Sequence, residues 1–153
     1  MWRRSLDLIS QALPLGTGLA HMAAHVSEHM RVDRCAVLLY DRTTDELTLQ
    51  VDRPGRSAPE VRLRLGVGLT GLAASGQRTI QVPHMGRDPR SVDLGHDLEY
   101  RGFIAVPIVE RDELIGVCTL QTLEERHFSA DDVTFLESTI RPLLALVVTT
   151  ARS

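Results

Sequence analysis

The sequence predicts an α+β domain in which helices flank an antiparallel sheet. The apolar run Cys35–Tyr40 is followed by the polar turn Asp41–Asp45 and then by a segment of alternating apolar residues. A second pair of apolar segments, Phe103–Val109 and Leu114–Leu120, is joined by four charged residues. Apolar runs separated by short polar turns are typical of β-hairpins. Segments with apolar residues at helical spacing precede the first hairpin and follow the second. This pattern indicates helices packed on an antiparallel sheet.

Two helices are expected before the first hairpin. Residues 1–15 carry an apolar stripe at helical spacing, and Pro14 ends this helix. The stripe consists of Trp2, Leu6, Ile9 and Leu13. Thr17 is placed to cap a second helix that ends near Met30. A chain of 153 residues is the size of one domain. We therefore expect a single domain, with 1–15 as an N-terminal helix and 16–153 as the body.

The last helix is expected to begin after Ser129 and to run to about Ala151. Ser129, with Asp132 three residues later, has the pattern of a helix cap. Pro142 lacks an N–H group and is expected to kink the helix near Thr139. A second apolar stripe on this helix comprises Phe135, Thr139, Pro142 and Leu146. Two interpretations stay open: helix 1–15 covers this stripe, or the stripe pairs with a second copy in a homodimer.

The centre of the chain combines short strands with loops. Val61–Leu65 alternates as a half-exposed strand, Gly66–Gly71 is a glycine turn before one or two helical turns, and Thr79–Val82 is a short strand. The polar segment 83–101 is longer than ordinary connections in a compact domain. Loops of this length are usually lids or binding loops.

Composition excludes several classes of chemistry. All 17 basic residues are Arg, and the chain has neither Lys nor Asn. Without Lys there is no Schiff base, no pyridoxal phosphate attachment and no P-loop lysine. Without Asn there is no N-glycosylation and no Cys-His-Asn protease.

Charge and hydropathy narrow the expected partners. The net charge of −3, dispersed arginines and few aromatic residues argue against nucleic acid. The longest C-terminal apolar run, Leu143–Val148, is too short to cross a bilayer. Two cysteines far apart in sequence fit a reducing compartment. We therefore expect a cytoplasmic protein with no membrane partner.

Two motifs have a plain structural interpretation. Gly66–Gly71 matches G-x-G-x-x-G, but no βαβ unit follows, so a turn with positive φ is favoured over a dinucleotide site. His21, His25 and His29 share one helix face, but that face lies well away from the apolar stripe. A solvated face is therefore favoured over a metal site there. We expect no metal site and no catalytic residues.

Several segments in order make the chain resemble a GAF domain, a small-molecule sensor module related to the PAS fold. They are Cys35–Asp41, Leu65–Gly71, Asp88–Arg90, Phe103–Ile108, Leu114–Val117 and Phe128–Asp132. The region around Glu125–Leu136 is most similar to the N-terminal GAF module of nitrogen-type phosphotransferase enzyme I. The resemblance covers about Leu6 to Val148. It implies a GAF/PAS-like antiparallel sheet, with the N- and C-terminal helices on one face and a loop-covered pocket on the other.

Departures from the family's patterns argue against several of its branches. Gln121-Thr122 stands where the cyclic-nucleotide branch has Asn-Lys. Thr70 stands where the branch that reduces free methionine sulfoxide has a cysteine, and Gly95–Gly102 contains no cysteine. The chain is therefore expected not to be an enzyme. Nothing in the sequence indicates a bilin site.

The resemblance implies a regulatory sensor domain that binds a small-molecule ligand and signals through its terminal helices. The motif positions assign the pocket to Thr70, His96, Tyr100, Arg101, Ile104 and Val106. Arg101 suggests an acidic group on the ligand, because a guanidinium pairs well with carboxylates. The expected partners are this ligand, a second copy of the chain and an effector domain outside the chain.

Two alternatives to this function stay open, and the cofactor is unknown. Haem-binding members of the family carry a His near the position of His96, whose imidazole can ligate haem iron. A solvated loop histidine explains the same residue. The chain can also be a dimerisation module without a ligand.

Overall fold

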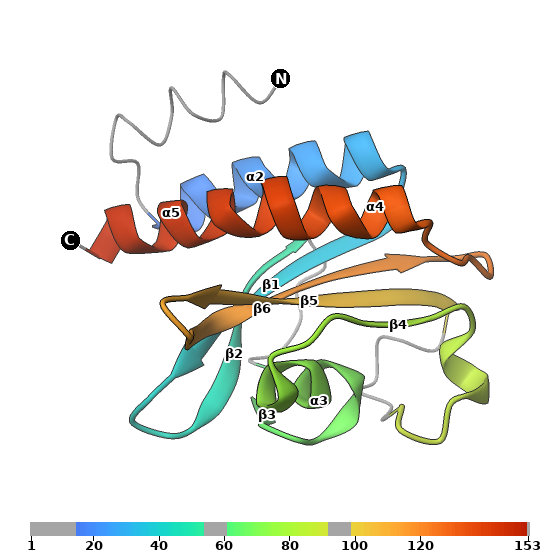
Figure 1. The fold of residues 1–153 in the computed structure, drawn as a ribbon, viewed down its shortest axis with the longest axis horizontal. Helices are drawn as coiled ribbons and strands as arrows, with labels where there is room; N and C mark the ends of the chain where they lie inside the picture. Colours follow the sequence, from blue (N-terminus) through green and yellow to red (C-terminus); the bar gives the residue numbers. More distant parts are fainter. Residues whose placement is uncertain (1–14, 54–60, 92–98, 153) are drawn as a thin grey trace.

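Six strands form one sheet in the computed structural model, which describes residues 15–53, 61–91 and 99–152 (Figure 1). The order across the sheet is β3-β2-β1-β6-β5-β4, and every neighbouring pair is antiparallel. The strands are β1 (Arg34–Asp41), β2 (Glu46–Arg53), β3 (Arg62–Arg64), β4 (Ile80–Val82), β5 (Gly102–Glu110) and β6 (Glu113–Thr122). The two predicted hairpins are β1–β2 and β5–β6. The predicted α+β class is confirmed.

Helices cover both faces of this sheet. On one face α2 (Leu15–Met30) lies beside the last helix, and on the other lies α3 (Gly68–Gly76) (Figure 1). The last helix comprises α4 (Ala130–Phe135), the π-helical segment η2 (Leu136–Ile140) and α5 (Arg141–Arg152). A single 3-10 turn, η1 (Met85–Arg87), follows β4.

The start of α2 differs from the prediction. The helix begins at Leu15, so Thr17 lies inside its first turn and is not its cap. The expected helix over residues 1–15 lies outside the described residues, except for Leu15 itself. Its proposed packing on the last helix is outside them too.

The central strands are apolar on both faces because helices cover both. From β1, Cys35 and Val37 pack into the core beneath α2 and α5, whereas Ala36 and Leu38 point to the side of α3. Successive side chains of a strand alternate between faces. Neighbouring residues of one strand therefore contribute to two different cores. A strand that lines a pocket on the α3 side also packs, through its other face, against α2 and the last helix.

The last helix begins as predicted and changes its hydrogen-bond spacing at the proline. The Ser129 Oγ accepts a hydrogen bond from the Asp132 N–H, and the Asp132 carboxylate accepts one from the Ser129 N–H, each 3.1 Å long. Pro142 has no N–H to donate to the Ser138 carbonyl. Directly before it, the ladder adopts π spacing over Leu136–Ile140. The disturbance expected near Thr139 is thus a π segment within a helix that continues into α5.

One helix in the described part of the chain, Ala130–Ala151, is long and apolar enough to span a membrane by length and composition. Core helices of soluble proteins meet the same criteria. Leu136, Ile140 and Leu144 of this helix are buried in the core beneath the sheet. Packing in the core therefore accounts for the apolar character of these three positions.

Arg126 ties the start of the last helix to the end of α2. Its Nη1 donates to the carbonyls of Met30 at 2.9 Å and Arg31 at 3.0 Å, where α2 leaves its last carbonyls without helical partners. Its Nη2 lies 3.6 Å from the carboxylate of Asp132, and its guanidinium lies 4.4 Å from the ring centre of Phe128. One side chain thus joins the end of α2 to the start of α4 and to Phe128 just before it.

The β1–β2 turn holds one of the two tyrosines of the chain against a carboxylate. The Tyr40 O–H donates to Asp45 Oδ1 at 2.5 Å, and this bond raises the pKa of Tyr40 above its usual value. The bond's contribution to stability is therefore complete at neutral pH and is lost as the pH rises through the folded-state pKa. In an absorbance titration, we expect Tyr100→Phe to ionise at higher pH than Tyr100→Phe/Asp45→Asn. Equal midpoints would contradict this bond.

Candidate functional site

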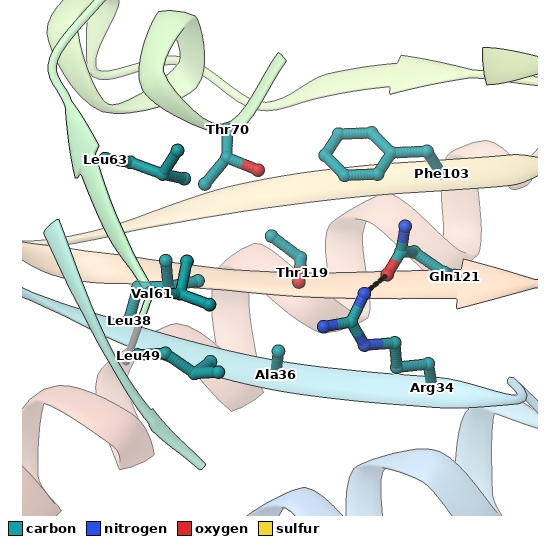
Figure 2. Close-up of a pocket in the computed structure, with 10 residues that line it drawn as sticks. All are labelled: Arg34, Ala36, Leu38, Leu49, Val61, Leu63, Thr70, Phe103, Thr119 and Gln121. Atoms are coloured by element: carbon teal, nitrogen blue, oxygen red, sulfur yellow. Dashed lines mark hydrogen bonds between the residues drawn. The ribbon is translucent and has the colours of Figure 1, made fainter. Parts of the chain in front are cut away.

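A cavity lies on the α3 side of the sheet (Figure 2). Its lining residues are Arg34, Ala36, Leu38, Leu49, Val61, Leu63, Thr70, Phe103, Thr119 and Gln121. The space open to the centre of a water-sized sphere is about 40 Å³. A space of that size holds roughly three water molecules. Six of the ten side chains are hydrocarbon, so the cavity is an apolar chamber with a few polar groups.

Strand alternation builds this chamber. Ala36 and Leu38 of β1 point into it, as do Thr119 and Gln121 of β6. Each pair is two residues apart, so both members lie on the same face of the sheet. Phe103 of β5 completes the floor, while β2, the β3 region and α3 supply the walls. The small side chain of Ala36 leaves the central part of the floor open.

A fixed guanidinium closes one end of the cavity. Arg34 Nε and Nη2 donate to the two carboxylate oxygens of Asp52 at 2.8 and 3.1 Å, and Nη1 donates to Gln121 Oε1 at 2.8 Å. The guanidinium also lies 5.8 Å from the ring centre of Tyr100. The side chains of Arg34 and Asp52 are only 12% and 7% exposed. This two-point pairing neutralises the one charged side chain among the described lining residues.

Two hydroxyls in the cavity have no hydrogen-bond partner among the described residues. They belong to Thr119 on the floor and to Thr70 on α3. Thr119 is 5% exposed, so its hydroxyl has little access to bulk water. A polar ligand group can therefore form hydrogen bonds here without first displacing a protein partner.

The glycine turn sets the position of Thr70. Gly66 and Gly68 have φ of 84° and 67°, in the left-handed region that favours glycine. At Gly71 a Cβ would lie 2.7 Å from the Arg64 carbonyl oxygen, and the Gly66 N–H donates to the Gly71 carbonyl at 2.9 Å. The turn thus needs positive φ and close backbone approach. It brings the first turn of α3, with Thr70, down onto the sheet.

The long segment 83–101 is fastened at its base. The Met85 N–H donates to the Arg101 carbonyl at 2.7 Å, and the Arg101 N–H donates to the Thr122 carbonyl at 2.8 Å. Within the segment, the Asp88 carboxylate accepts hydrogen bonds from the backbone N–H and guanidinium of Arg90. The guanidinium contact lowers the pKa of Asp88 below its usual value. The acidic-proline motif is therefore a locally closed turn.

Of the five predicted pocket residues that the structure describes, one lies in the cavity lining. Thr70 lines it. Tyr100 is buried near Arg34 but is not among the lining residues. Arg101 is exposed and is not among them either, so the acidic ligand group expected from Arg101 has no support in this geometry. His96 lies outside the described residues.

The prediction of Ile104 and Val106 as lining residues differs from the structure. Both point into the core beneath the helices, whereas their neighbours Phe103 and Ala105 face the α3 side. The physical reason is that β5 is apolar on both faces. Alternation then gives no indication of which set faces the pocket.

Sequence reasoning missed the polar end of the cavity. Thr119 and Gln121 are polar residues at alternate positions of an otherwise apolar strand, which is a detectable signal that one face meets something polar. Arg34 at the start of β1 is a weaker indication in the sequence of a polar end to the cavity. Its pairing with Asp52 and Gln121 depends on strand register that no local pattern reveals.

Both cysteines lie on the far side of the sheet from the cavity. Cys35 and Cys118 are buried in the core beneath the helices, with 3.9 Å between their sulfurs. The neighbouring thiol of Cys118, together with burial, raises the pKa of Cys35. A buried thiol with a raised pKa, as Cys35 has, stays protonated at neutral pH and reacts slowly.

Two of the three histidines of α2 are less exposed than expected, whereas His29 is exposed. His21 and His25 are half-buried with 4.3 Å between their ring centres, and His29 lies 4.6 Å from the ring centre of Phe135. Within the described residues, no group of three or more His, Cys, Asp or Glu side chains is placed to hold a metal ion.

Comparison with known proteins identifies similar domains. The family model described as GAF domain matches residues 14–143. The GAF domain of a phosphoenolpyruvate-protein phosphotransferase from Coxiella burnetii is 26% identical, with a TM-score of 0.87 over 98% of this chain and 91% of that chain. The corresponding domain from Acinetobacter is 25% identical, with a TM-score of 0.84 over 98% and 91%.

An enzyme of the same fold is among the similar structures. The free methionine-R-sulfoxide reductase from Neisseria meningitidis, solved with its substrate, is 22% identical, with a TM-score of 0.84 over 98% of this chain and 87% of that chain. Further reductases of this kind also match. They contradict the expectation that the chain is not an enzyme, because proteins of this fold include enzymes. At these identities the likeness shows the fold alone and does not assign catalysis to this chain.

Proposed function

Because the chain belongs to the GAF domain family, a family of regulatory modules that bind small molecules, we propose that it binds a small-molecule ligand in the cavity on the α3 side of the sheet. Membership confirms the resemblance seen in the sequence. The observation that carries the proposal is the cavity itself, an apolar chamber in which Thr70 and Thr119 offer hydroxyls without partners in the described structure. Such a chamber with a few convergent polar groups is the usual form of a ligand site.

We further propose that ligand binding is transmitted to α2 and α5. The supporting geometry is the alternation of β1 and β6: Ala36 and Thr119 face the cavity, while Cys35 and Cys118, next to them, pack beneath the helices. A shift of either strand toward a ligand therefore alters the surface on which the helices lie. A ligand that binds one helix arrangement better than another shifts the population between them.

The two phosphotransferase GAF domains support a regulatory role in a larger assembly. In this proposal the terminal helices are the output, either to an effector domain or to a second copy of the chain. The half-buried Phe135 and the exposed Leu146 lie on the last helix, which is consistent with such an output surface.

Filling the cavity tests the proposal. Ala36→Val adds a β-branched side chain to a strand and occupies part of the 40 Å³ space. We expect its melting temperature without ligand to equal or exceed that of the wild type. The wild type and variant are compared by thermal shift across free amino acids, their amides, small alcohols and small carboxylic acids. We expect at least one compound to stabilise the wild type by mass action and to lose that effect in Ala36→Val.

Leu123→Ala, an exposed position outside the cavity lining, is the matched control and should respond to the same compound. A ligand response that survives in Ala36→Val would contradict binding in this cavity. Absence of any stabilising compound, with a dimer in native mass spectrometry, would favour a dimerisation module without a ligand.

A further inference from the structure

We propose that Asp52 makes the pocket select small neutral ligands over carboxylates, by occupying the guanidinium of Arg34. This inference rests on the proposed function and concerns the charge of the ligand. It assigns a specificity role to a residue that does not line the cavity. The ligand class it names is a short apolar group that carries an amide or a hydroxyl.

Arg34 would attract an anion if it were unpaired. It is the one charged side chain among the described residues of the lining, and a guanidinium binds carboxylates in a two-point geometry. Asp52 already provides that geometry, with hydrogen bonds of 2.8 and 3.1 Å to Nε and Nη2. Nη1 donates to Gln121 Oε1 at 2.8 Å, and the guanidinium carbon lies over the Tyr100 ring, 5.8 Å from its centre.

A carboxylate that entered this end of the cavity would meet a neutral ion pair. It would lose its hydration on entry and gain little attraction, because the charge of Asp52 cancels that of Arg34. The ligand carboxylate would also lie near the carboxylate of Asp52, and the two negative charges repel each other. A ligand carboxylate is also not expected to replace Asp52 on Arg34. The Asp52 side chain is only 7% exposed, and its charge would then be nearly buried without the guanidinium.

A neutral group has no such penalty. The hydroxyls of Thr70 and Thr119 can donate to or accept from an amide or a hydroxyl, and neither has a partner to give up in the described structure. The remaining lining is hydrocarbon from Ala36, Leu38 and neighbouring side chains. The cavity therefore suits a molecule with one neutral polar end and a short branched or straight apolar part.

The test uses two probes with one carbon skeleton, isobutyramide and isobutyrate. Each is titrated at pH 7 and constant ionic strength into the ¹⁵N-labelled chain, and amide shifts of the cavity strands report binding. We expect wild type to bind isobutyramide about tenfold more tightly than isobutyrate. Asp52→Asn keeps the size of the side chain but removes the carboxylate charge that pairs with Arg34. This variant should gain about tenfold in isobutyrate affinity and keep its isobutyramide affinity within about twofold.

Two variants control for structure and net charge. Asp52→Glu restores the pairing and should restore the preference for the amide. Glu113→Gln removes one negative charge at an exposed position, 65% accessible, and should leave the preference unchanged. If Asp52→Asn does not fold, the wild-type selectivity and the Asp52→Glu result still test the inference.

The outcomes separate this inference from the proposed function. Isobutyrate binding to wild type as tightly as isobutyramide, or an unchanged ratio in folded Asp52→Asn, would overturn the role of Asp52 alone. Absence of shifts in the cavity strands with either probe and in every variant would overturn both the role of Asp52 and the cavity as a ligand site.

Discussion

Gly116→Val is expected to lower the free energy of unfolding by about 3 kcal/mol or more, the upper range for forced overpacking. Gly116 lies on β6 opposite Leu39 of β1. A Cβ at this position would collide with the Leu38 carbonyl oxygen and press on the Leu39 Cα. Both are backbone atoms held by the β1–β6 pairing, so no rotamer change relieves the collision. The two strands that form the cavity floor would have to separate.

Urea denaturation followed by circular dichroism measures this loss. A change of this size in a domain of this length lowers the melting temperature by roughly 10 °C. Gly16→Ala is the control, because nothing lies within 4 Å of a Cβ there and the residue is in the first turn of α2. That variant should be as stable as wild type or more stable by up to about 1 kcal/mol. A denaturation midpoint for Gly116→Val equal to wild type would contradict the close strand approach.

Arg126→Ala is expected to lower the free energy of unfolding by about 2 kcal/mol, the range for hydrogen bonds from a charged group. The change removes both hydrogen bonds that Nη1 donates at the end of α2, to the carbonyls of Met30 and Arg31, and the contact with Asp132 at the start of α4. It also removes the cation from the ring of Phe128. The end of α2 should therefore fray, and its amide protons should exchange faster with solvent.

Arg87→Ala is the matched control for Arg126→Ala. Arg87 pairs with Glu125 at 3.0 Å, but its side chain is 75% exposed. Exposed ion pairs contribute little to stability, so this variant should change the free energy of unfolding by less than about 1 kcal/mol. Equal losses for the two variants, or unchanged exchange at the end of α2, would show that Arg126 does not anchor that helix.

Local sequence patterns were sufficient to predict the fold but not to predict which residues line the cavity. The hairpins were readable because turns and alternation are local, and Ser129 with Asp132 marked the last helix for the same reason. The faces of β5 were not readable, because helices cover both sides and both sets of side chains are apolar. The sequence therefore could not show whether Ile104 and Val106, or their neighbours Phe103 and Ala105, face the cavity.

The polar end of the cavity depends on long-range pairing. Arg34 meets Asp52 across β1–β2 and Gln121 across β1–β6, at sequence separations of 18 and 87 residues. Only the register of three strands places these groups together. A bulge in β1–β2 between Val37 and Leu38 shifts that register, and no sequence pattern predicted it. Thr70 was identified because the glycine turn that positions it is itself a local motif.

The central claim is that a small molecule binds on the α3 side of the sheet and that the terminal helices respond. The most direct measurement is a titration of the ¹⁵N-labelled wild type with isobutyramide, followed at cavity strand amides and at α5 amides in the same spectra. We expect shifts at residues 34–38 and 117–121 and at residues 141–151, with one shared dissociation constant. Shifts confined to the cavity strands, or helix shifts that persist in Ala36→Val, would contradict the claim.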